Sequence, residues 1–143
     1  MSSTIENIDR SGLTRLGQSG TPDDVQSAWK AFSSVHAEPV VRISDALEET
    51  SLVALEQTWS TMAASLGVVS DRGEFLLTVS GEGTFGLPWF HVRANNKQFS
   101  IRDLGMESDE PDFIASSLDR SVSIAVSTEE SEFWILVARN PAA

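Results

Sequence analysis

The chain has 143 residues, of which 41% are hydrophobic and 22% charged, a composition typical of a folded domain. The absence of cysteine excludes disulfides, thiolate metal sites and a cysteine nucleophile, and it fits a reducing compartment, so we expect a cytoplasmic protein. The formal net charge of −11 argues against binding to nucleic acid or an anionic membrane, because both need clustered Lys and Arg. No stretch approaches the roughly 18 apolar residues that span a bilayer.

The N-terminal region is polar and contains Gly12, Gly17 and Gly20, which predicts a flexible arm over residues 1–20. Order is expected to begin at Thr21, so that residues 21–143 form a single α+β domain. Thr21 suits the N-cap position of a helix, and the Pro and two Asp residues that follow it suit the first turn.

Apolar residues recur at spacings of three and four in two segments, which predicts two amphipathic helices. The stripe of the first helix is Val25, Ala28, Trp29, Phe32 and Val35. The stripe of the second helix is Leu52, Leu55, Trp59, Met62 and Leu66, with Gly67 placed to end it. Between the two helices, Pro39 and the apolar residues that follow it predict a short strand at a sheet edge.

From residue 74 the hydrophobic period changes to two, which predicts strands. The expected strands are 74–80, 87–94, 97–103, 121–127 and 133–138. A tight turn at Asn95-Asn96 would set Val92 opposite Phe99 and Trp89 opposite Arg102. A turn at Glu129-Glu130 would set Val126 opposite Phe133, Ile124 opposite Ile135 and Val122 opposite Val137. Pro111 is expected to open a short helix between the two hairpins.

The expected element order is helix, short strand, helix, three strands, short helix and two strands. Such an order favours an α+β fold with a single antiparallel sheet of about five strands, and with the two main helices packed on one face.

Acidic residues are concentrated in one region of the chain. Residues 103–132 hold nine acids and one base, a charge of −9 + 1 = −8 out of −11. A regional field of this kind can steer a cationic partner toward the protein. The candidate partner-binding acidic surface is Asp103, Glu107, Asp109, Glu110, Asp112, Glu129 and Glu130.

A possible second contact face is Trp89, His91, Arg93 and Arg102, which the expected hairpin places on one side. Tryptophan and arginine are frequent among residues that dominate interface energies. The alternative is that a helix covers this face and that Trp89 belongs to the core.

No residue pattern points to a reaction. The string Gly81-Glu82-Gly83-Thr84-Phe85-Gly86 matches a dinucleotide-binding motif, but a strand follows it where that motif requires a helix. Neither His36 nor His91 belongs to a recognisable triad or zinc motif. The acids from Glu107 onward lack the glycine and glutamate positions of a calcium-binding loop. We therefore expect no catalytic residues, no metal and no cofactor.

The first functional hypothesis is a small acidic inhibitor of the immunity-protein type, which neutralises a basic toxin or nuclease and is favoured as a monomer. Its carboxylates would take the place of substrate phosphates. The alternative is a dimeric acidic secretion chaperone that binds an extended segment of a secreted effector. A third possibility, an enzyme built on carboxylates, has the least support in the sequence.

Overall fold

The computed structural model describes residues 4–32, 39–44, 46, 48–80, 86–94, 99–104, 112–129 and 131–139, without the side chains of Thr4, Glu48 and Arg102. Its elements are α1 (Thr4–Arg10), β1 (Leu13–Ser19), α2 (Pro22–Phe32), β2 (Val41–Ser44), α3 (Glu48–Ser65), β3 (Glu74–Val79), β4 (Trp89–Ala94), α4 (Ile101–Leu104), β5 (Phe113–Ser116), β6 (Val122–Thr128) and β7 (Glu132–Arg139).

The strands form one antiparallel sheet, so the expected α+β class is confirmed. Within the described residues the sheet has seven strands rather than about five, in the order β1-β4-β3-β5-β6-β7-β2. The helices α2 and α3 occupy the two segments with helical periodicity, and β2 is an edge strand, as expected. Much of the expected connection at 81–86 and the Asn95-Asn96 turn lie outside the described residues.

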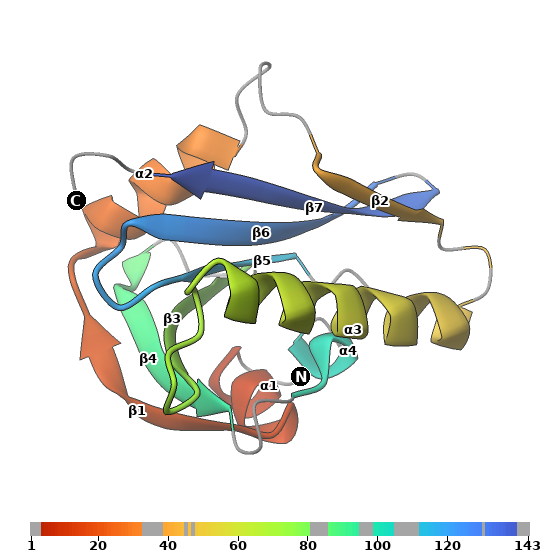
Figure 1. Cartoon of the computed structure of the whole chain (residues 1–143). Helices are drawn as coiled ribbons and strands as arrows, with labels where there is room; N and C mark the ends of the chain where they lie inside the picture. The colour runs from red at the N-terminus through yellow and green to blue at the C-terminus, as the bar shows by residue number, and fades with distance from the viewer. Residues whose placement is uncertain are drawn as a thin grey trace.

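The two main helices pack on opposite faces of the sheet, so the expectation that they share one face is wrong. On β3, Phe75 and Leu77 belong to the larger core beneath α3, whereas Leu76 belongs to a second cluster with Val25 of α2. Successive side chains of a strand point to opposite faces, and a strand that is apolar on both sides needs cover on both. Figure 1 shows α3 in front of the sheet, with α2 behind it.

The N-terminal region differs from the expected flexible arm. Helix α1 and strand β1 occupy residues 4–19, and β1 pairs antiparallel with β4 from Leu13↔Ala94 to Ser19↔Trp89. Ile8 is fully buried in the larger core. Gly12 has a φ of 100°, a left-handed conformation that glycine adopts readily, and it joins α1 to β1. The glycines therefore mark turns and a bulge within ordered structure.

The expected strand 97–103 is also wrong, because Ile101–Leu104 form the short helix α4. Ile101 and Leu104 are both buried, at the spacing of three that suits a helical turn. Glu56 of α3 accepts a hydrogen bond from the Ile101 backbone N–H at 2.8 Å, which caps α4. β4 pairs with β1 and β3 instead of with a following strand.

Two further differences lie in the C-terminal part. Phe113–Ser116 form the strand β5 instead of a short helix, since a short apolar run does not distinguish the two from its periodicity. In the last hairpin Val126 pairs with Ile135, and Thr128 pairs with Phe133. This register is two residues from the expected one. Because the shift is even, the expected side chains keep the same face.

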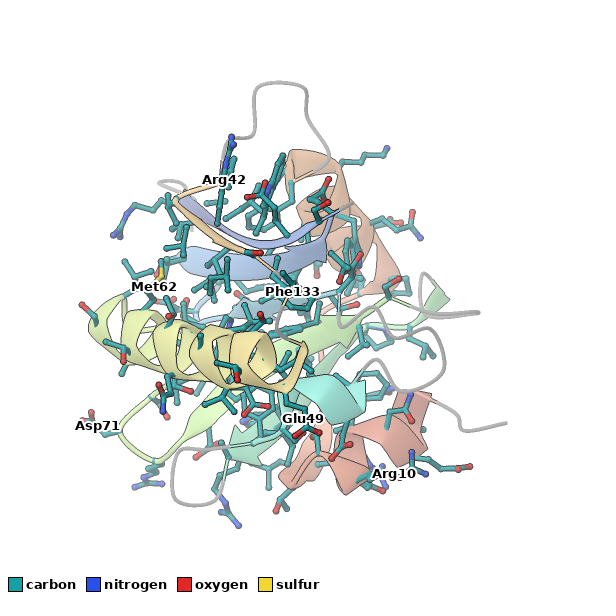
Figure 2. The ribbon with its side chains drawn as sticks, turned by 90° about the vertical axis from the view of Figure 1, so that its right-hand side faces the viewer. Arg10, Arg42, Glu49, Met62, Asp71 and Phe133 are labelled. Atoms are coloured by element: carbon teal, nitrogen blue, oxygen red, sulfur yellow. The ribbon has the colours of Figure 1, made fainter. Side chains whose placement is uncertain are left out.

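Aromatic rings fill the centre of the larger core. The ring centroid of Trp59 lies 5.1 Å from that of Phe99, 5.6 Å from that of Phe113 and 5.9 Å from that of Phe75. Tilted and edge-on contacts at these distances are favourable beyond the buried area itself. Figure 2 shows Phe133 between the sheet and α3, whereas Arg10, Arg42 and Asp71 lie at the periphery.

Two aliphatic positions on α3 test this packing. Leu55 is fully buried, whereas Val53 is 51% exposed. We expect Leu55→Ala to lower the free energy of unfolding by about 2–5 kcal/mol because it leaves a cavity in the core. Val53→Ala should change it by about 0.5 kcal/mol or less. Urea unfolding of both variants measures the difference, and equal losses would contradict the placement of α3.

Candidate functional site

Three described acids gather at one end of the sheet, and we call Asp112, Glu129 and Glu132 the acidic sheet end. The Asp112 carboxylate accepts a hydrogen bond from the Thr128 backbone N–H at 2.6 Å, which joins the start of β5 to the end of β6. The Glu129 N–H donates to the Glu132 carbonyl at 2.8 Å across the β6–β7 turn. This end lies at the right of Figure 1 and faces the viewer in Figure 2.

Neighbouring donors hold each carboxylate of the acidic sheet end. The Ser127 hydroxyl donates to the carboxylate of Glu129, and the Trp134 indole N–H donates to Glu132 at 3.0 Å. Side chains that are already fixed lose little rotamer freedom when a partner binds. The acidic sheet end is therefore a preorganised group of negative charges.

The structure brings together only part of the acidic surface expected from the sequence. Asp112 and Glu129 lie at the acidic sheet end, and Glu132 joins them although the sequence reasoning did not place it in the binding set. Asp103 lies elsewhere, in α4, which packs against α1 and α3. The remaining candidates, Glu107, Asp109, Glu110 and Glu130, lie outside the described residues.

The structure describes part of the second expected contact face. Trp89 is 2% exposed and packs in the cluster beneath α2, so its alternative reading as a core residue is the correct one. His91 and Arg93 follow on the same side of β4, where the His91 imidazole lies 2.8 Å from the Glu74 carboxylate. Arg102 belongs to α4, and its side chain lies outside the described residues, as does all of His36.

A groove of about 580 Å³ lies between α2 and the strand ends at the opposite end of β6. Many of the residues that line it are small, so neither the helix nor the sheet fills the space between them. These are Ser27, Ala28 and Ala31 of α2 and Ser116, Ser123 and Ala138 of the sheet. A volume of this size lies within the range of small-molecule binding sites in proteins. Sequence periodicity gave no signal for this groove.

The start of α2 and the β5–β6 turn meet at the mouth of the groove. Thr21 and Asp24 form a reciprocal cap, in which the Thr21 N–H donates to the Asp24 carboxylate at 2.9 Å. Arg120 donates to the same carboxylate at 2.8 Å. The Thr21 N–H and Arg120 together hold the pKa of Asp24 below its usual value. Both partners are partly exposed, so this ion pair contributes little to stability.

The β5–β6 turn is organised around Asp119. The Ser117 hydroxyl donates to the Asp119 carboxylate at 2.7 Å, and the Ser121 backbone N–H donates at 2.9 Å. These hydrogen bonds lower the pKa of Asp119 from 3.8 to about 2, and the bond from Ser117 has the largest effect. Arg120 has a φ of 62°, a left-handed conformation that costs a non-glycine residue about 1 kcal/mol or more. The turn thus holds Arg120 in place at the groove.

The described residues hold neither a metal-binding group nor a membrane-spanning helix. No group of three or more histidine or acidic side chains there could hold a metal ion. No helix in the described part of the chain is long and apolar enough to cross a membrane. Comparison of the chain with protein-family models, with curated proteins and with solved structures finds no significant match. Function is therefore argued from the site alone.

The lowered pKa of Asp119 makes a pH-dependent prediction. A carboxylate with a depressed folded-state pKa stabilises the fold above its unfolded pKa, and this contribution is lost as the pH falls through the folded value. The pKa of Asp119 is lowered from 3.8 to about 2, so its contribution to stability is expected to be lost as the pH falls through this interval. Asp119→Asn should make the fall in stability between pH 4 and pH 2 shallower. Urea unfolding at several pH values measures this slope.

An NMR titration of the Asp119 carboxyl group tests the cause directly. We expect an apparent pKa near 2 in the natural chain and a value closer to 3.8 in Ser117→Ala, which removes the donating hydroxyl. An unchanged titration in the variant would contradict the assigned cause.

Proposed function

We propose that the protein is a non-catalytic binding protein that uses its acidic sheet end to bind a basic surface of another protein. The observation that supports this proposal is the arrangement of Asp112, Glu129 and Glu132 at one end of the sheet, with their carboxylates held by Thr128, Ser127 and Trp134. A fixed group of like charges costs repulsion in the free protein, and an oppositely charged partner relieves it.

The charge of the whole chain supports the same choice of partner. The net charge is −11, so a basic protein is attracted at long range as well as at contact. Such attraction raises association rates well above those of neutral pairs and weakens as salt is added. This field also repels nucleic acid, which is consistent with a protein partner.

Within this class we propose an inhibitor of the immunity type, which covers the cationic substrate site of a toxin or nuclease. The carboxylates would occupy positions that substrate phosphates otherwise take. Their preorganisation favours this role, because tight inhibitor complexes form with little backbone movement. The dimeric secretion chaperone stays a prediction from the sequence.

The test is kinetic and uses the full chain. After affinity capture of partners from the native host, we expect a basic partner bound 1:1. Its association rate should fall steeply between 50 and 500 mM salt, because the Debye length falls from about 14 Å to about 4 Å over this range. Glu129→Gln and Glu132→Gln together should lower the association rate about tenfold at low salt, since both keep an acceptor oxygen but lose the charge.

A matched control removes the same charge elsewhere. The double variant Glu6→Gln and Asp71→Asn alters two exposed acids away from the acidic sheet end and should leave the rate within about twofold. A salt-independent rate, or equal rates for the two double variants, would contradict the proposal.

A further inference from the structure

We propose that the groove beneath α2 binds a small amphipathic molecule with an apolar body and one negatively charged head. The groove lies at the opposite end of β6 from the acidic sheet end, so this site is separate from the proposed protein-binding surface. The shape of the groove supports this assignment, as do a buried donor and a guanidinium that have no partner among the described residues.

The apolar side chains that line the groove indicate that the body of the ligand is apolar. Ala28, Ala31 and Phe32 of α2 line the groove together with Trp89 and Ala138 of the sheet. Small side chains here leave about 580 Å³ where larger ones would fill the helix–sheet interface. An apolar chain or ring of the ligand would restore the contacts that this gap lacks.

A buried donor in the wall is left without an acceptor. Trp89 is 2% exposed, and its indole N–H has no hydrogen-bond partner among the described residues. The ring carbon next to this nitrogen, Cδ1, lies near Gly20, which comes shortly before α2. A Cβ on Gly20 would lie 3.5 Å from Cδ1 of Trp89 and 3.0 Å from Arg120. A buried polar group without a partner is uncommon and costly, and a ligand acceptor would satisfy it.

The charge of the ligand's head group follows from which charged side chains of the groove already have partners in the protein. Asp24 is engaged by Thr21 and Arg120, and Asp119 is engaged by Ser117 and Ser121. Both acids keep a lowered pKa, so they stay ionised. The lining carries two acids and two arginines, a formal sum of −2 + 2 = 0. Arg139, at the end of β7, is exposed and has no ion-pair partner among the described residues.

Among the described residues that line the groove, Arg139 offers a guanidinium without an ion-pair partner, and this favours a ligand with a single anionic head. Arginine offers five N–H donors in a planar fork, which matches a carboxylate with two parallel hydrogen bonds. Arg120 uses one of its terminal nitrogens on Asp24 and keeps other N–H groups for the same ligand. The chemistry therefore fits a monocarboxylate with an apolar chain, such as a medium-chain fatty acid.

Calorimetric titration of the full chain with sodium decanoate, below its micelle concentration, tests this site. We expect saturable 1:1 binding, with about fivefold weaker binding of the neutral analogue 1-decanol. Arg139→Gln should weaken decanoate binding about fivefold and leave decanol unchanged. Ala31→Phe places a ring in the groove from an exposed helix position and should abolish binding of both. In an assigned NMR spectrum, decanoate should shift the indole N–H signal of Trp89.

The matched control is Arg72→Gln, which removes the same charge from an exposed turn outside the groove and should bind like the natural chain. Thermal unfolding of each variant confirms that it is folded before titration. Absence of saturable binding, equal affinity for decanoate and decanol, or natural affinity in the folded Ala31→Phe variant would each overturn the proposal.

Discussion

Burial of the central strands on both faces is the constraint on which the rest of the structure depends. Every residue of β5 is buried, and the apolar residues of β3 divide between two clusters on opposite sides of the sheet. Such a sheet is stable only when each face is covered. Helix α3, with α1 and α4, covers one face, and α2 covers part of the other. The core beneath α3 is the larger of the two, and it contains the aromatic cluster around Trp59.

The two candidate sites follow from this arrangement. Among the described helices, α2 is the one that packs on this side of the sheet, and its small residues leave a groove over the strand ends. At the other end of β6, the connections into β5 and β7 carry the acidic residues, and backbone hydrogen bonds of the sheet fix them there. The protein thus has a donor-rich groove at one end of β6 and an acidic surface at the other. Different ligand chemistries suit the two ends.

Local patterns in the sequence predicted the elements that local forces determine. The stripes of α2 and α3, the cap at Thr21 and the edge position of β2 all depend on residues near one another in the chain. The even register error in the last hairpin kept the expected side chains on the same face, because the period of a strand is two. Asp112 and Glu129 were also recognised from sequence as candidate acids, although their convergence at one end of the sheet was not.

The remaining features depend on contacts between distant residues. β1 pairs with β4 across more than seventy positions of the chain, as in Leu13↔Ala94, and no local signal indicates that pairing. Ile101 and Leu104 suit a strand or a helical turn, and the cap from Glu56 decides the outcome. Leu76 interrupts the alternation of apolar and polar residues in β3, and it belongs to the second buried face. The groove arises from such contacts too.

The most direct test of the two-sided sheet is a nuclear Overhauser measurement from the indole N–H of Trp29. In the structure this group donates to the Thr78 hydroxyl at 3.3 Å, which joins α2 to the face of β3 opposite α3. The account predicts a strong effect between the Trp29 indole proton and the Thr78 methyl group. Strong effects from Trp29 to Phe75 or Leu77, with none to Thr78, would place α2 on the same face as α3 and contradict it.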